Sequence, residues 1–196
     1  METLEKRLVT APATEPVSSV EAKLHCRVDH SAEDALITAL ITAARMHVEN
    51  ETGQALITQT WEVVLDGWPQ VLRLPHAPVS AVTSVTYRDE AGVTSPLAAT
   101  AYTVRTGLTP VQVVFDQDAL PAATLADVGP IAVRYTAGYG AAASVPKPIF
   151  QAMLLLIGHW YQNREAVTAQ SAGPLAMAVD ALLEPYRLHW FGPWVV

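Results

Sequence analysis

The chain has 196 residues, of which 51% are hydrophobic and only 16% are charged, and its mean hydropathy is +0.22. A chain of this length can bury one full core and still have apolar side chains left for contacts with partners. The formal net charge of −7 disfavours specific binding to nucleic acid, because such proteins need a basic surface to neutralise phosphates. We therefore expect one domain, with part of the apolar surplus in interfaces.

The first 17 residues contain several prolines and polar residues and no long apolar stretch. We interpret residues 1–17 as an extended N-terminal arm and not as a signal peptide. The longest apolar run in the chain, from Ile149 to Trp160, is shorter than the ~20 residues that span a bilayer. The sequence therefore predicts a protein made in the cytoplasm that does not enter a membrane.

Two helical patterns follow the arm. Ser18 and Glu21 form a capping-box pattern, which predicts a helix over residues 19–27. A second helix is expected over residues 32–52, because apolar residues recur there every three or four positions. Gly53 follows the last of them and fits a C-terminal cap.

Between residues 55 and 136 the pattern changes to short alternating segments rich in β-forming residues. Turn residues such as Asp89-Glu90-Ala91-Gly92 separate these segments. The region predicts a small antiparallel sheet built of hairpins. The expected strands cover residues 57–65, 81–88, 102–105, 111–115 and 131–136, with one more after the turn.

Helical patterns return after the β region. Residues 147–164 are apolar nearly all round and predict a central helix, and residues 174–184 predict a short last helix that ends at Pro185. The fold class is thus α+β: a helical bundle formed by the N- and C-terminal helices, with an inserted antiparallel β-hairpin region. One domain over residues 18–185 would contain all of these elements.

The residue types that carry chemistry occur in no recognisable constellation. The six histidines are scattered without a metal-binding HExxH spacing, and no serine lies in a GxSxG motif. The lone Cys26 excludes an internal disulfide and is interpreted as a small buried residue. We therefore expect no catalytic residue, no metal and no cofactor, and predict that the protein is not an enzyme. A pocket of convergent polar groups would instead favour the alternative of an enzyme or ligand-binding domain.

The last eleven residues, 186–196, are unusually rich in aromatic side chains, although chain termini are commonly polar. Such a segment either packs on its own domain or anchors in a groove of another protein, since tryptophan and tyrosine dominate interface hot spots. These physical considerations leave both interpretations open.

A series of short motifs occurs in a fixed order along the chain. They are Pro16-Val17, Ser19-Val20-Glu21-Ala22-Lys23-Leu24-His25, Arg27-Val28-Asp29, Glu33-Asp34, Leu40-Ile41, Ala43-Ala44-Arg45, Val48-Glu49, Thr52-Gly53, Gln59-Thr60-Trp61, Leu74-Pro75, Pro78-Val79, Val85-Thr86-Tyr87, Tyr135, Ala137-Gly138-Tyr139-Gly140, Val145-Pro146, Leu154-Leu155-Leu156, Gly158-His159-Trp160-Tyr161 and Asn163-Arg164-Glu165. In this order they resemble the head-tail connector (adaptor) proteins of long-tailed bacteriophages and of prophage-derived particles such as gene transfer agents. The resemblance extends over residues 16–187, and the aromatic segment beyond them departs from the family pattern.

The resemblance implies a structural role at the neck of a virion or phage-like particle. Subunits would form a ring, expected to be dodecameric, that docks on the dodecameric portal protein and contacts a stopper or tail-completion protein. DNA would pass through the lumen without specific binding, and the net negative charge would keep phosphates from adhering to the channel wall. The alternative within the same class is that the chain is itself the stopper or tail-completion protein.

The resemblance also assigns residues to these contacts. In related adaptors the C-terminal segment docks on the portal, which favours the anchor interpretation of the aromatic tail. The expected portal-docking residues are Tyr186, Arg187, Leu188, Trp190, Phe191 and Trp194. The expected contacts between ring subunits are Ala39, Ala43 and Ala44, whose small side chains allow close approach of helices, together with Arg45.

Overall fold

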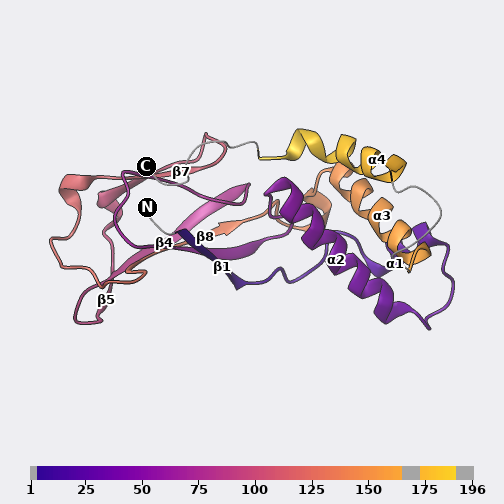
Figure 1. The fold of residues 1–196 in the computed structure, drawn as a ribbon, viewed down its shortest axis with the longest axis horizontal. Coiled ribbons are helices and arrows are strands. Elements are labelled where there is room, and N and C mark those ends of the chain that lie inside the picture. Colours follow the sequence, from indigo (N-terminus) through magenta and orange to yellow (C-terminus); the bar gives the residue numbers. More distant parts are fainter. Residues whose placement is uncertain (1–3, 165–172, 189–196) are drawn as a thin grey trace. The chain divides into compact units, whose positions relative to one another are not determined.

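The computed structural model describes residues 4–164 and 173–188 and divides into two compact units. Of these residues, the helical unit contains 13–57, 139–164 and 173–187, and the β unit contains 4–12, 58–138 and Leu188 (Figure 1). The expected α+β class is confirmed, since helices from both parts of the chain form one unit and the inserted antiparallel strands form the other. Where the sequence predicted one domain, there are two units, because the strands and the helices each enclose a core of their own.

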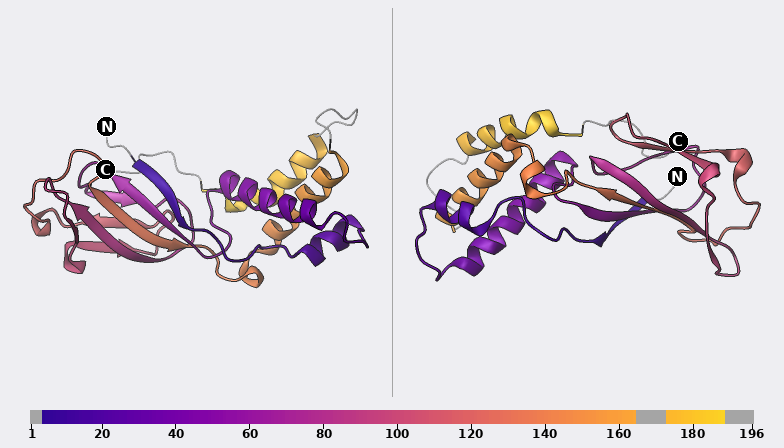
Figure 2. Two further views of the ribbon diagram at one scale, coloured as in Figure 1. Left: turned by 90° about the horizontal axis from the view of Figure 1, so that it is seen from below. Right: turned by 180° about the vertical axis from the view of Figure 1, so that it is seen from behind.

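A five-stranded antiparallel sheet with the order β1-β2-β8-β4-β5 forms the larger part of the β unit (Figures 1 and 2). Its strands are β1 (Leu4–Thr10), β2 (Gln59–Leu65), β4 (Val79–Arg88), β5 (Thr94–Pro96) and β8 (Ile131–Ala137). In the centre, Val63 pairs with Val133 and Leu65 pairs with Ile131, and all four side chains are fully buried. The sheet therefore depends on pairs that lie about 70 residues apart, and only β4 and β5 form a local hairpin within it.

The expectation of an extended N-terminal arm over residues 1–17 is corrected. Leu4–Thr10 form strand β1, which pairs antiparallel with β2. Arg7 on β1 and Arg134 on β8 both donate to the carboxylate of Glu62 on β2, at 2.8 Å from the Arg7 Nε and 2.7 Å from the Arg134 Nη2. Burial pushes the pKa of Glu62 upward, but the two arginines outweigh it and hold this pKa below its usual value. Sequence reasoning missed β1 because its partner strand begins almost 50 residues later.

A second, three-stranded sheet has the order β3-β7-β6. Its strands are β3 (Val71–Arg73), β7 (Gln112–Phe115) and β6 (Tyr102–Arg105). The ring of Trp68 lies 5.5 Å from that of Phe115 on β7 and 6.1 Å from that of Tyr87 on β4, between centroids. Trp68 therefore contacts both sheets, and the β region is more than the single sheet of hairpins that the sequence predicted.

The helical unit is built around α3, which contacts each of the other three helices. The helices are α1 (Ser19–Cys26), α2 (Asp34–Thr52), α3 (Lys147–Gln162) and α4 (Gly173–Leu183). The expected capping box is present: the Glu21 N–H donates to the Ser18 hydroxyl at 3.2 Å, and the Ser18 N–H donates to the Glu21 carboxylate at 2.8 Å. Gly53 caps α2 at a φ of 69°, in the left-handed region that glycine adopts without strain.

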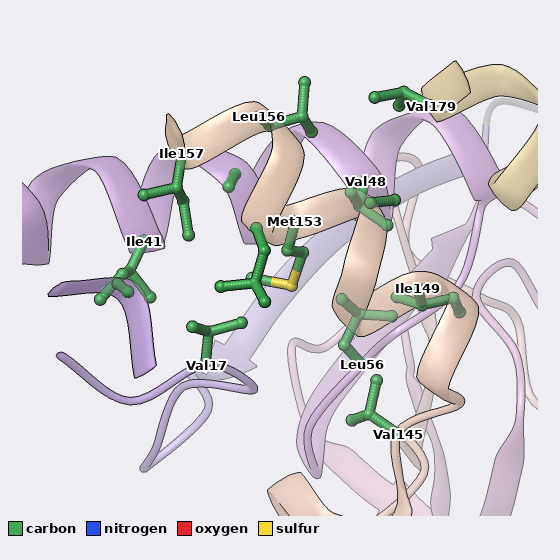
Figure 3. Packing of buried hydrophobic residues seen from close by; sticks show 14 of the residues in the cluster. Val17, Ile41, Val48, Leu56, Val145, Ile149, Met153, Leu156, Ile157 and Val179 are labelled. Atoms are coloured by element: carbon green, nitrogen blue, oxygen red, sulfur yellow. The ribbon is translucent and has the colours of Figure 1, made fainter. Parts of the chain in front are cut away.

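The core of the helical unit gathers on α3, whose Ile149, Met153 and Ile157 are fully buried (Figure 3). They pack with Ile41 and Val48 of α2, and with residues from the segments before α1 and after α2. Its central position explains why the sequence of α3 is apolar nearly all round, with Lys147 and Gln151 among its exposed polar residues. In the part of the chain that the structure describes, no helix is both long and apolar enough to cross a membrane.

Candidate functional site

In the described part of the chain, the residue types that carry chemistry are distributed over both units. Across residues 4–164 and 173–188, no group of three histidine, cysteine or acidic side chains lies close enough to hold a metal ion. His76 stacks on Trp61 with the ring centroids 3.9 Å apart, and burial, with a smaller contribution from Lys6, lowers the pKa of His76 to about 4. This imidazole is therefore a neutral packing group at neutral pH. The candidate sites are instead surfaces and anchor points.

Arg187 fixes the point at which the C-terminal segment leaves the helical unit. Its guanidinium donates to Asp180 at 2.8 Å, to Glu184 at 2.8 Å and to Glu51 of α2 at 3.2 Å. Of the expected docking residues, Tyr186 and Arg187 thus belong to the helical unit, with Tyr186 closing a short 3-10 helix at residues 184–186. Leu188 is half-buried, and Trp190, Phe191 and Trp194 lie outside the described residues.

Gln54 ties this exit to the place where the chain returns from the β region. Its side-chain amide donates to the backbone carbonyl of Tyr186 and accepts a hydrogen bond from the hydroxyl of Tyr139. Gln54 is only 9% exposed, so both bonds are largely shielded from water. Burial, with a contribution from nearby Tyr186, raises the pKa of Tyr139 and keeps its hydroxyl protonated as a donor.

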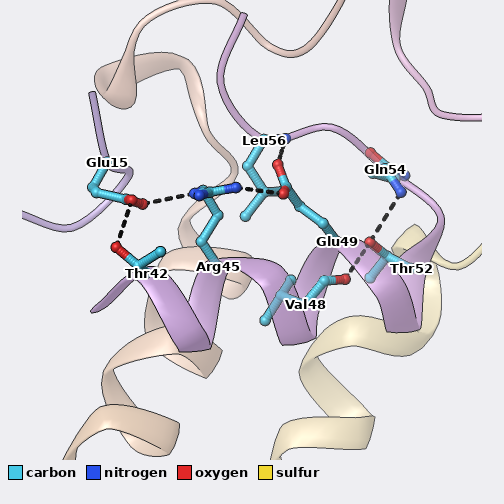
Figure 4. A network of polar contacts seen from close by, with 8 residues as sticks. All are labelled: Glu15, Thr42, Arg45, Val48, Glu49, Thr52, Gln54 and Leu56. Carbon is cyan, nitrogen blue, oxygen red and sulfur yellow. Dashed lines mark hydrogen bonds and ion pairs between the residues drawn. The ribbon is translucent and has the colours of Figure 1, made fainter. Parts of the chain in front are cut away.

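Arg45 on α2 holds the two remaining segments through a buried network of charges (Figure 4). It donates to Glu15 at 2.8 Å and to Glu49 at 2.7 Å, and Glu49 in turn accepts the backbone N–H of Leu56 at 2.9 Å. Thr42 also donates to Glu15, at 2.9 Å. Burial disfavours the charge of Arg45, but the two glutamates raise its pKa above the ordinary arginine value.

Together these contacts define an anchor cluster, formed by Arg45, Glu49 and Glu51 in the C-terminal half of α2 and by Gln54 just after its end. The chain crosses between the helical unit and the β unit at residues 12–13, 57–58, 138–139 and 187–188. Near each crossing, on the helical side, one residue is bound by this cluster: Glu15, Leu56, Tyr139 and Arg187. The cluster therefore fixes where every crossing segment leaves the helical unit.

The outer face of α2 is an exposed surface without charged residues. It consists of Leu36, Ala39, Ala43 and Met46, of which Leu36 is 36% exposed and Met46 is 53% exposed. The charged side chains in the middle of α2 point inward into the anchor cluster. Exposed helix faces normally carry charges, so an uncharged one over three turns is a candidate interface.

This face contains two of the four expected ring contacts. Ala39 and Ala43 are exposed, whereas Ala44 is fully buried in the core and Arg45 is 8% exposed within the anchor cluster. The structure therefore gives Ala44 and Arg45 roles inside the subunit, and ring contact stays a prediction for Ala39 and Ala43. Leu36 and Met46 were missed, although their spacing of three residues from Ala39 and from Ala43 places them on the same face.

An open depression of about 320 Å³ lies among α2, α3 and α4. Its apolar floor includes Leu156, Trp160 and Val179, and the ring of His47 contacts that of Trp160 edge-on at 5.9 Å. Glu51 and Asp180, which bind Arg187, form part of its rim. Of its polar lining residues, His47, Glu51 and Asp180 are exposed and His159 is half-buried.

Comparison with known proteins places these features in a family. The family model described as head completion protein matches residues 17–177. No curated protein matches the chain.

Solved structures match nearly the full length. A chain of the neck of an empty gene transfer agent (GTA) particle, computed with C6 symmetry, is 27% identical with a TM-score of 0.80, and the match covers 96% of this chain and 97% of the other. A chain of the virion of a native GTA particle is 27% identical with a TM-score of 0.78, covering 96% and 98%. A chain of the neck of a native GTA particle, computed with C12 symmetry, is 25% identical with a TM-score of 0.70, covering 96% and 97%.

Proposed function

Because this chain belongs to the head completion protein family, we propose that it is a structural component of the neck of a tailed phage or phage-like particle. The observation that carries the proposal is the match to chains of GTA necks, which includes both units and covers at least 96% of each chain. A shared fold over the full length supports a shared place in the particle more strongly than a match of one unit would.

We further propose that the protein is the head-to-tail adaptor, a ring of identical subunits that docks on the portal. The similar necks were computed with C6 and C12 symmetry, so a cyclic arrangement is the natural expectation for this chain. The uncharged outer face of α2 supports it, because Ala39 and Ala43 offer a shallow surface between Leu36 and Met46. Burying such a face costs no desolvation of charge.

The aromatic tail is proposed to hold the ring to the portal. The anchor cluster supports this role, since its Gln54 binds Tyr186 and its Glu51 binds Arg187, which fixes the start of the tail in the helical unit. A fixed starting point reduces the conformational entropy that the tail would lose on docking. Trp190, Phe191 and Trp194 would supply the apolar contacts that dominate binding energy at interfaces.

The channel through the ring is proposed to pass DNA without binding it. The chain carries a net charge of −7, which opposes adhesion of phosphates. The check is a titration of DNA of random sequence at low salt. Absence of binding at micromolar protein is expected, and tight binding would contradict a passive channel.

The docking proposal is tested by mixing the purified protein with the portal protein from the same particle. Truncation after Leu188 is the sharpest variant, because it removes residues 189–196 and keeps the Arg187 anchor. We expect the truncated chain to lose at least about tenfold in affinity, since three aromatic anchors are removed. Equal binding would exclude the tail as anchor. Binding to another neck ring, with none to the portal, would favour a stopper or tail-completion protein.

A further inference from the structure

The outer face of α1 exposes the two large aliphatic side chains of this helix. Val20 is 74% exposed and Leu24 is 79% exposed, while Ala22 between them is fully buried. Residues two positions away on a helix are rotated by about 200°, so Val20 and Leu24 both point away from the side that packs on the helical unit. The helix thus presents a ridge of two apolar side chains to solvent.

Local structure gives no reason for this ridge. The capping box already stabilises the N-terminus of α1, and the opposite side of the helix approaches α3 so closely that a Cβ on Gly158 would lie 3.0 Å from the His25 ring. Exposed positions on a short helix are normally polar, and each of these side chains would bury a sizeable apolar area against a partner. The ridge therefore has the character of an unpartnered contact surface.

The outer face of α2 has the complementary shape. Val20 and Leu24 are four residues apart on α1, and Ala39 and Ala43 are four residues apart on α2, so both pairs span about 6 Å along their helices. One pair is large and the other is small, and Leu36 and Met46 stand on either side of the small pair. A ridge of this spacing fits a groove of the same spacing, which is how helices pack on one another.

A closed ring needs two different surfaces on each subunit. In a cyclic assembly with more than two subunits the contact is heterologous, so one surface of each copy meets another surface of the next. The helical unit offers such a pair: the α1 ridge, formed by Val20 and Leu24, and the α2 groove, formed by Leu36, Ala39, Ala43 and Met46. Both are exposed and free of charge, and they differ in shape.

We propose that the α1 ridge of one subunit packs into the α2 groove of the next, and that this contact closes the ring. The inference rests on the ring proposed above and names its partner surface, which is a second copy of this chain. Leu24 lies against Ala43 or Ala39, and burial of the ridge and groove contributes to the cohesion of neighbours. The tail and the β unit remain available for other contacts in the neck.

Cysteine cross-linking of necks isolated from particles made with the variant chain tests the contact. Cys26 is first replaced by serine, so that Leu24→Cys and Ala43→Cys supply the only thiols. The double variant is expected to give a ladder of covalent multimers on mild oxidation, since every subunit contributes both partners. Each single variant is expected to stay monomeric. Val128→Cys with Ala43→Cys is the matched control, because Val128 is similarly exposed, at 74% against 79% for Leu24, but lies in the β unit.

The outcomes distinguish failure of the proposed contact from failure of the proposed ring. Cross-linking of the Leu24→Cys single variant to itself would show a symmetric pairing of ridges and overturn the proposal. Intact necks without any ladder, or with a ladder only in the Val128 control, would overturn it and leave the ring in place. Absence of multimers of this chain in wild-type necks would overturn the proposed ring function as well.

A second variant, Leu24→Asp, tests whether the contact contributes to assembly. Leu24→Asp is expected to weaken incorporation into necks by at least about tenfold, because it places a charge in an apolar interface. Its thermal unfolding should stay close to that of the wild type, since Leu24 is 79% exposed and does not belong to the core cluster. Normal incorporation of Leu24→Asp would contradict the proposal.

Discussion

Among the described residues, the helical unit and the β unit each hold a cluster of charges around a buried central residue, and the two clusters are built in opposite ways. In the helical unit Arg45 lies between two glutamates whose side chains are 27% and 12% exposed. In the β unit Glu62 lies between two arginines that are 59% and 45% exposed. Water screens the second cluster far more than the first. The difference indicates that removing the central charge should cost more in the helical unit than in the β unit.

Both clusters nevertheless hold the N-terminal segment in place. Arg7 binds Glu62 within the β unit, and Glu15 binds Arg45 within the helical unit. One ion pair therefore fixes the segment in each unit, on either side of the crossing at residues 12–13. Variants of each cluster should destabilise one unit at a time, which makes the comparison testable.

The largest effect is expected for Arg45→Met. The substitution leaves Glu15 and Glu49 partly buried without their cation, and breaking a buried pair in this way costs about 3 kcal/mol. Urea unfolding followed by circular dichroism of the helices measures it. Arg105→Met, at an exposed position on β6, is the control and should change stability by less than about 0.5 kcal/mol. A loss below about 1 kcal/mol for Arg45→Met would contradict the importance of the anchor cluster.

The β unit should show its own pH dependence through His76. The folded state lowers the pKa of this imidazole from 6.5 to about 4, so the unfolded chain binds the proton first as the pH falls. Its contribution is complete above pH 6.5 and is lost as the pH falls toward 4, by about 3 kcal/mol in total. His76→Phe, which keeps a ring against Trp61, should flatten the slope between pH 6.5 and 4. An unchanged slope would show that other groups control the transition.

A smaller loss is expected for Glu62→Gln in the same unit, about 1–2 kcal/mol, because its arginine partners are half exposed. The folded state lowers the pKa of Glu62, so its contribution is present above the ordinary value of 4.5 and disappears as the pH falls below it. The difference in unfolding free energy between wild type and variant should therefore shrink in acid. A difference larger than that of Arg45→Met would reverse the comparison of the two units.

The smallest effect is expected for Ser18→Ala, which removes one half of the capping box of α1. Loss of an N-cap side chain costs about 1 kcal/mol. Hydrogen exchange of the α1 amides should report it, because the change is local to this helix. The neighbouring Ser19→Ala is the control, since Ser19 is exposed and lies within the helix. Equal protection of the α1 amides from exchange in both variants would show that packing, and not the cap, holds helix α1.

Local sequence patterns predicted the helical unit more completely than the β unit. The pattern of Ser18 and Glu21 and the glycine after α2 mark helix ends through contacts three or four residues apart, so they are readable along the chain. Strand β1 is fixed by pairing with β2, and strand β3 has only three residues, so neither leaves a local pattern. The division into two units depends on such distant pairs and could not be predicted from periodicity.

The candidate sites, like the fold, were predicted in part from the sequence. Ala39 and Ala43 were found from their small size, and Ala43 also belongs to the motif Ala43-Ala44-Arg45. The exposure of Leu36 and Met46 beside them depends on which face of α2 meets α3, and that appears only in the folded chain. Gln54 gave no sequence signal, because its two partners lie 85 and 132 residues away.

The central claim is that this chain forms a closed ring at the neck. Its most direct test is the native mass and rotational symmetry of the complex between this protein and the portal of its own particle. The account predicts a closed ring of identical subunits with cyclic symmetry and an open channel for DNA. Subunits that bind the portal singly, or as isolated dimers without contact between neighbours, would contradict it.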